Sequence, residues 1–218
     1  MRALFSAAIV AAVLSGAALA ASGERVQIHF NAADQAAARR AVAHRTDLGS
    51  AAGWTGGATK PDLSAAPTCA NFHPKQRDLV LTGAAASKWS YSGLQIYTQS
   101  QVLKTPAMVA ADWQRTVVAP TAIPCQRSHV LKDLGAGVTF VSFRRVLFPP
   151  VATRSRAYVL LVDVKTQTGK VRVAIELVLI GTGRTELTIE STAPNVAQKV
   201  VAQADAQLAR ALVARAVR

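Results

Sequence analysis

Two short stretches of this sequence each place a histidine four residues after a cysteine, and both residue types can bind a metal ion. CANFHPK begins at Cys69 and CQRSH begins at Cys125, so His73 and His129 each follow a cysteine by four residues. These are the only cysteines in the chain. Thiolates and imidazoles are ligands that zinc prefers, so the four side chains form a candidate metal site. The alternative is a Cys69–Cys125 disulfide with two histidines nearby.

The N-terminal residues favour the disulfide, because they indicate export. MRALFSAAIVAAVLSGAALA carries one charge, at Arg2, followed by an apolar run and an A-x-A pattern that ends at Ala20. This order is typical of a signal peptide cut after Ala20, and the apolar run is short for a membrane span. An uncleaved anchor is the alternative. We therefore expect a secreted or otherwise extracytoplasmic chain with no further membrane span.

Export bears directly on the two cysteines, since a cysteine pair in an oxidising compartment is usually bonded. The mixed C-x3-H spacing also differs from the C-x2-C and H-x3-5-H pairs of common structural zinc sites. The sequence therefore predicts a Cys69–Cys125 disulfide, which closes a loop of roughly 55 residues and contributes about 4 kcal/mol. The zinc set Cys69, His73, Cys125 and His129 stays open as the alternative, and no cofactor is expected.

The chain is strongly basic, with 25 lysines and arginines against 12 aspartates and glutamates among its 218 residues. Outside a cell, such a charge favours anionic envelope polymers, lipid headgroups or acidic small molecules as partners, and the expected location argues against nucleic acid. The cationic residues are scattered rather than gathered in one run. The length suits one domain. We expect a signal peptide over residues 1–20, a flexible lead-in over 21–30 and a single α+β domain over 31–218.

Local patterns predict the elements of this domain. Asn31 is placed to cap an alanine-rich helix that extends to residue 48, and a long loop rich in glycine and proline follows. The predicted strands are 78–83, which resumes at 87–91 across a bulge, and then 93–103, 138–148, 156–165, 171–180 and 185–191. The further predicted helices are 106–118, which begins after Thr105 with Pro106, and then 124–134 and 196–217.

The last third of the chain reads as an antiparallel meander. Strict alternation predicts Val173 and Ile175 on a packed face, with Glu176, Glu186 and Glu190 on a wetter outer face. The final helix is expected to cover the packed face. The fold class predicted from these elements is α+β, an antiparallel β-sheet meander with helices packed on one face.

The order of these features resembles the extracellular sensor domains of PknH-type receptor kinases of actinobacteria, in a free-standing version. The matching residues are Gly53-Trp54 before the first cysteine, the tryptophan helix VAADWQ, and Cys125 within IPCQRS. An N-terminal helix, two strands, a meander and a C-terminal helix complete the match, which spans residues 31–217. The resemblance lies in order and spacing rather than in long motifs.

The resemblance implies a one-sided sheet with helices and a cleft for an unidentified ligand. It also implies two disulfides, of which Cys69–Cys125 corresponds to the first. The second is missing, so the segment near residues 126–150 is expected to differ in shape. No kinase accompanies this chain, so signalling through a membrane is not implied.

Three functions remain open at this point. A sensor-like domain would bind an anionic small molecule or envelope component, an envelope-associated structural protein would bind anionic polymer through its charge, and an extracellular hydrolase would need a catalytic set. No G-x-S-x-G or H-E-x-x-H motif supports the hydrolase, so we expect no enzyme and no catalytic residues. Arginines can bind anions and strand aromatics can line a site. The candidate ligand-binding residues are Arg144, Arg145, Arg154, Arg156, Trp89, Tyr91 and Tyr97.

Each candidate also has an ordinary structural explanation. Arginines at strand ends are usually solvated, and strand aromatics usually pack against their cross-strand neighbours. The ligand and the oligomeric state are not specified by these residues.

Overall fold

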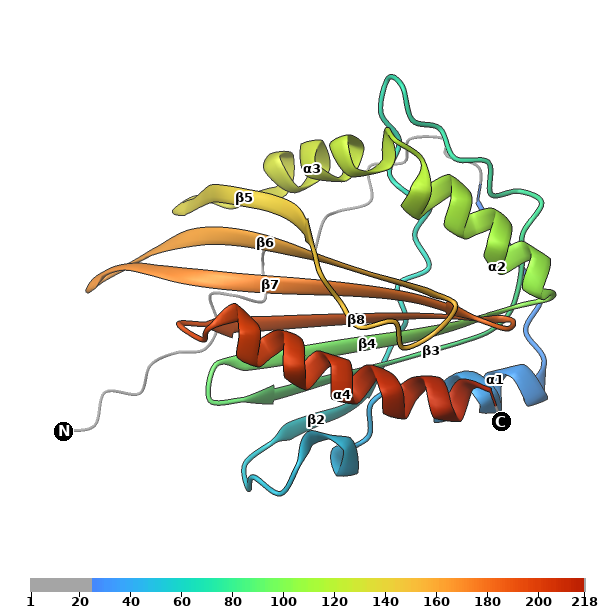
Figure 1. The fold of residues 1–218 in the computed structure, drawn as a ribbon, viewed down its shortest axis with the longest axis horizontal. Coiled ribbons are helices and arrows are strands. Elements are labelled where there is room, and N and C mark those ends of the chain that lie inside the picture. The colour runs from blue at the N-terminus through green and yellow to red at the C-terminus, as the bar shows by residue number, and fades with distance from the viewer. Residues whose placement is uncertain (1–24, 218) are drawn as a thin grey trace.

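The structure is a computed structural model that describes residues 25–217 (Figure 1). The predicted signal peptide lies outside the described residues. The fold is α+β. Its strands are β1 (Gln27–Ile28), β2 (Thr55–Thr59), β3 (Val80–Tyr91), β4 (Leu94–Leu103), β5 (Val138–Val146), β6 (Arg154–Thr166), β7 (Gly169–Thr182) and β8 (Thr185–Pro194). Its helices are α1 (Ala32–Arg40), the 3-10 turn η1 (Arg45–Leu48), α2 (Pro106–Trp113), the π-turn η2 (Gln114–Val118), α3 (Ala122–Asp133) and α4 (Gln198–Ala216).

The strands form one sheet in the order β1-β3-β4-β8-β7-β6-β5, and β2 pairs with β3 as well. Every pair is antiparallel except β1 with β3. Strands β5 to β8 form the predicted meander. Two short strands were not predicted from the sequence. Strand β1 lies in the expected lead-in, and β2 lies in the expected long loop. Within the described part of the chain, no helix is long and apolar enough to cross a membrane.

Helices pack on both faces of this sheet rather than on one (Figure 1). We call the two sides the α4 face, which α1 and α4 cover, and the α2 face, which α2 and α3 cover. On the α4 face, Leu208 and Leu212 of α4 pack against Val178 and Ile189. On the α2 face, Val130 of α3 packs against a cluster of strand residues, Leu160, Val162, Val164, Val173 and Ile175.

Strand β7 explains the need for two helical layers. Val173 and Ile175 face α3, whereas Val178 and Ile180 face α4, so the strand is apolar on both sides. A strand of this kind is stable only when both faces are buried. The expectation that α4 covers the side of Val173 and Ile175 is therefore wrong. The same alternation buries Glu176 on the α4 face, where it is 1% exposed, although the pattern had placed it outside.

Helix α1 lies very close to the sheet, as its alanine-rich face requires. Asn31 caps it as predicted, because the Asn31 side chain accepts a hydrogen bond from the Asp34 backbone N–H at 2.9 Å. Ala38 and Val42 pack against Ala85 of β3. The approach depends on Gly83, where a Cβ atom would stand 2.3 Å from the Asp34 carbonyl oxygen. A side chain at this position would push α1 away from β3.

Candidate functional site

A recess of about 490 Å³ lies at the end of the sheet where α1 begins. In Figure 1 this is the right-hand side, where the turn between β7 and β8 approaches α1. Its walls come from β1 and the residues after it, the first turn of α1, β3, the residue after β4, and the β7–β8 turn. The lining residues are Gln27, His29, Asn31, Asp34, Val80, Thr82, Lys104 and Arg184. The sequence predicted none of them as site residues.

Backbone hydrogen bonds hold these segments together. The backbone N–H of His29 donates to Leu81 at 2.9 Å, which fixes β1 beside β3. The N–H of Lys104 donates to the Val80 carbonyl at 2.8 Å. The turn is attached by the N–H of Leu103, which donates to the Arg184 carbonyl at 2.8 Å. The recess is therefore framed by main-chain contacts.

Arg184 and Asp34 form the central ion pair of the recess. The Arg184 guanidinium lies 2.6 Å from the Asp34 carboxylate and also donates to the Leu103 carbonyl at 2.9 Å. Burial alone raises the pKa of Asp34, but the nearby polar side chains of Thr82 and Asn31 and the Arg184 guanidinium lower the pKa below its ordinary value overall. Asp34 is therefore ionised at neutral pH, and its charge offsets that of Arg184.

Lys104 and His29 are the other residues of the recess that can carry a positive charge. Both residues are exposed, and neither side chain makes a hydrogen bond or ion pair with another described residue. With Asp34 and Arg184 cancelling, Lys104 leaves the recess with a net positive charge, and a protonated His29 would add to it. An anion is the ligand that this balance favours.

The four arginines predicted to bind a ligand do not converge in the structure. Arg144 and Arg145 are consecutive on β5 and so point to opposite faces; Arg144 donates to the Gln198 side chain at 3.0 Å, and Arg145 is exposed. Arg156 donates to the Val117 carbonyl at 2.8 Å, which fastens η2 to the α2 face. Arg154 lies on the same face as Arg156, two residues earlier on β6.

The three predicted aromatic residues also have structural partners. The Trp89 Nε1–H donates to the Ala43 carbonyl at 3.1 Å on the α4 face. Tyr91 stacks on Trp54 with ring centroids 5.3 Å apart. The Tyr97 hydroxyl donates to the Gln99 side-chain oxygen at 2.5 Å on the α2 face. Trp89 and Tyr91 share one face of β3, whereas Tyr97 lies on the other face of the sheet, so the three rings do not line one common site.

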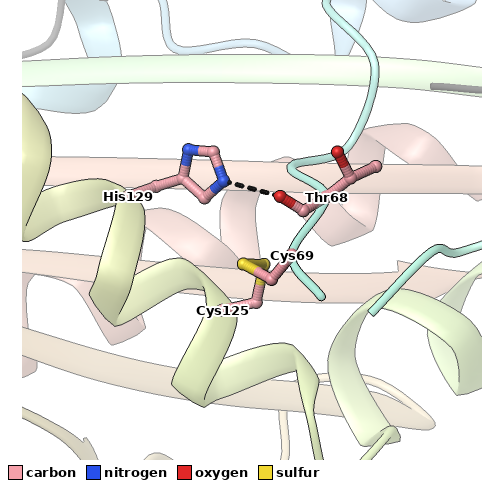
Figure 2. Close-up of a disulfide and its surroundings, with 4 residues drawn as sticks. All are labelled: Thr68, Cys69, Cys125 and His129. Atoms are coloured by element: carbon pink, nitrogen blue, oxygen red, sulfur yellow. Dashed lines mark hydrogen bonds between the residues drawn. A yellow bond between two sulfur atoms is a disulfide. The ribbon is translucent and has the colours of Figure 1, made fainter. Parts of the chain in front are cut away.

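The predicted disulfide is present. Cys69 and Cys125 are bonded, with their Cα atoms 5.7 Å apart, and the bond joins the loop after β2 to α3 (Figure 2). His129 lies beside it, and its Nε2 is 3.1 Å from the Thr68 carbonyl oxygen. His73 is exposed and does not join the group. Because both sulfurs are used in the bond, this form of the chain does not contain the four-residue zinc set.

Sequence reasoning missed a pair of buried carboxyl groups on the α4 face. Glu176 of β7 and Asp205 of α4 are 1% and 2% exposed. Asp205 accepts a hydrogen bond from the Ser191 hydroxyl at 2.6 Å, but both Glu176 oxygens and the second Asp205 oxygen have no partner among the described residues. Burial, with the nearby Asp205 charge, raises the pKa of Glu176 to about 7, and burial raises that of Asp205 to about 7.

A second group of carboxyls lies on the α2 face. Asp112 of α2 accepts a hydrogen bond from the Gln76 side chain at 3.3 Å, and burial raises the pKa of Asp112. Burial and then the Asp112 charge raise the pKa of Glu186 well above its ordinary value, while the charge of Arg154 lowers it. Arg154 therefore acts on an internal carboxyl group, which leaves less of its charge for a ligand.

Comparisons with known proteins give a likeness of fold. No family model matches the chain, and no curated protein matches it. The extracellular domain of PknH from Mycobacterium tuberculosis aligns at 10% identity and a TM-score of 0.37, over 63% of this chain and 65% of that one. An uncharacterised protein of Mycobacterium smegmatis, an Rv0999 ortholog, aligns at 12% identity and 0.38, over 63% and 66%.

In both cases the match spans just under two thirds of the other chain. The PknH domain belongs to the PknH-type sensor domains, whose order of features this sequence resembles. At these identities and TM-scores the likeness carries no argument about function, which rests on the residues of this chain.

Proposed function

We propose that this protein is an exported, sensor-like binding domain that holds an anionic small molecule in the recess between β1, α1 and the β7–β8 turn. The observation that carries the proposal is the cationic lining of this recess, in which Asp34 offsets Arg184 and Lys104 is left without a partner among the described residues. The volume of about 490 Å³ falls within the range of small-molecule sites.

The lining suits recognition of a phosphate-like or carboxylate group. Lys104 offers three N–H donors on a flexible stem, and His29 offers one or two according to its protonation. Arg184 is held in place by Asp34 and the Leu103 carbonyl, so it provides a fixed wall whose charge Asp34 offsets. The N terminus of α1 adds little, because Asn31 and Asp34 already occupy it.

The same residues support binding rather than catalysis. Thr82 is the one hydroxyl-bearing residue among those that line the recess, and it donates to the Val102 carbonyl at 3.0 Å. It is therefore not aligned with a general base in the way that an activated nucleophile requires. The proposal assigns no enzyme activity to this site.

Export is part of the proposal, and the disulfide supports it. A bond between the only two cysteines of the chain is typical of proteins in an oxidising compartment. The predicted signal peptide agrees with that location. A simpler function, adhesion to anionic envelope polymer, is favoured by the excess of lysine and arginine, 25 against 12 acidic residues.

Titration of inorganic phosphate into the chain from residue 21 tests the proposal. We expect saturable shifts of the backbone amide resonances around Gln27, Thr82 and Arg184. The Lys104→Ala variant should weaken binding by about tenfold or more, which corresponds to the loss of one charge-assisted contact. Lys132→Ala, which removes an exposed lysine from α3, should not change phosphate binding.

Two results would overturn the recess as the site. One is equal phosphate binding by the Lys104→Ala and Lys132→Ala variants. The other is binding to polyanions that never saturates, falls steeply with salt and is unaffected by Lys104→Ala, which would support envelope adhesion instead.

A further inference from the structure

The disulfide and His129 form a compact three-residue group that the proposed function does not use. The two Sγ atoms and one imidazole nitrogen lie within 4.8 Å of one another. In a tetrahedral zinc site, ligand atoms are separated by roughly 3.5–3.8 Å, given bond lengths of about 2.3 Å to sulfur and 2.0 Å to nitrogen. Small side-chain rotations are therefore enough to reach that geometry once the sulfurs are no longer bonded.

Two of these residues are positioned by a single helix. Cys125 and His129 are four residues apart on α3, so they share one face of that helix. Figure 2 shows the His129 ring beside the disulfide, with one nitrogen directed at the Thr68 carbonyl. A carbonyl oxygen only accepts, so this Nε2 carries the proton in the present form.

Contacts other than the disulfide hold Cys69 in place. Cys69 and Phe72 exchange two backbone hydrogen bonds, at 2.9 and 3.0 Å. Phe72 is 5% exposed and packs with Ala122 and Cys125, which places the Cys69–Phe72 turn against the start of α3. The hydrogen bond between His129 and Thr68 joins the same two segments. These contacts do not depend on the sulfur–sulfur bond, so they keep the two thiols near His129 after its cleavage.

We propose that reduction of the Cys69–Cys125 disulfide converts this place into a binding site for a thiophilic d10 metal ion, zinc or cuprous copper. Cys69, Cys125 and His129 are its three protein ligands. Two thiolates and one imidazole are the donor set that such ions prefer, and three protein ligands leave one coordination position open for water or a small molecule. The oxidised chain has no free thiolate and does not bind the ion here.

The conversion balances with a low-molecular-weight thiol as the reductant. Two thiol molecules supply two electrons and two protons, the Cys69–Cys125 bond breaks, and the two reductant molecules leave as their own disulfide. The ion then displaces the two cysteine protons. His129 binds through Nε2 as a neutral imidazole, with its proton moved to Nδ1 and its bond to Thr68 given up.

Cobalt titration of the reduced chain from residue 21 tests this site. The protein is reduced with a phosphine, separated from it without oxygen, and titrated with Co²⁺. We expect one equivalent to bind, with thiolate-to-cobalt charge transfer and the intense visible bands of a tetrahedral ion, and zinc should displace it. His129→Ala should weaken binding by about tenfold or more, since even indirect support of a ligand has an effect of this size. The His73→Ala control, from the same loop region, should bind as the unchanged chain does.

Each outcome of the cobalt titration either supports or contradicts the proposed metal site. Binding by the oxidised chain, or equal affinity of the unchanged chain and His129→Ala, would overturn the proposal. If circular dichroism shows that reduction alone unfolds the chain, added zinc should restore the fold, because metal binding is coupled to folding. A reduced, unfolded chain that zinc does not restore would also overturn it.

Discussion

Asp34 in the recess and Glu176 beneath α4 are both acidic residues on the packed side of an element, yet their environments shift them in opposite directions. The side chain of Asp34 is 14% exposed and lies against Arg184, and its pKa is lowered. Glu176 is 1% exposed, has no cation as a partner, and its pKa is raised to about 7. Burial favours the neutral acid in both places, and only the recess supplies a counter-charge that reverses the effect.

The difference indicates what each region is built to hold. The recess keeps Asp34 ionised, because Arg184 lies beside it as a counter-charge. Burial of Glu176 and Asp205 favours their protonated forms, so the pair contributes less to stability as pH rises through about 7. The recess therefore holds a charged pair, whereas the pair beneath α4 makes the stability of the fold depend on pH.

Of three variants that test this comparison, Gly83→Ala is expected to change the free energy of unfolding most. The added Cβ would stand 2.3 Å from the Asp34 carbonyl oxygen, so α1 must shift, which displaces Asp34 from its place beside Arg184. We expect a loss of about 2–4 kcal/mol in the free energy of unfolding, measured by urea denaturation. Gly135→Ala is the matched control, since a Cβ there meets no atom within 4 Å. A Gly83→Ala chain as stable as this control would contradict the close approach of α1.

Glu176→Gln tests the second acid of the comparison, the buried carboxyl group that lacks a counter-charge. The folded-state pKa of about 7 lies above the ordinary value of 4.5, so the folded state binds the proton more tightly. This contribution to stability is fully present below about pH 4.5 and is lost as pH rises through 7. We expect Glu176→Gln to be more stable than the unchanged chain at pH 8 by about 2 kcal/mol, and the gain to shrink at pH 5.

Thermal denaturation at the two pH values measures the effect of Glu176→Gln. Asp133→Asn, an exposed site on α3, should show no comparable pH-dependent gain. A gain for Glu176→Gln that is the same at pH 5 and pH 8 would show that proton binding is not its cause.

Of the three variants, Arg184→Gln should have the smallest effect on the free energy of unfolding. The Arg184 side chain is 40% exposed, so solvent screening limits the value of its bond to Asp34 to about 1 kcal/mol. The clearer expected result is a higher pKa of Asp34, followed by carboxyl resonances in an NMR titration. An unchanged Asp34 pKa would mean that the counter-charge does not distinguish this acid from Glu176.

The sequence by itself determined the local features of this protein. The hydrophobic period predicted the meander and α4, Thr105-Pro106 predicted the start of α2, and Asn31 the start of α1, because each depends on residues a few positions apart. The disulfide was also predictable, since a chain with only two cysteines and a predicted export signal allows one pairing.

Only the tertiary structure decided which groups meet. Alternation along β7 does not tell which helix covers which side, so Glu176 was expected in solvent and lies beneath Asp205. The recess joins residues near 30, 82, 104 and 184, which come together only through the strand order of the sheet. The physical reason is that periodicity is a property of neighbours in the chain, whereas burial and counter-charges depend on partners brought close by the sheet and by the helices packed on its two faces.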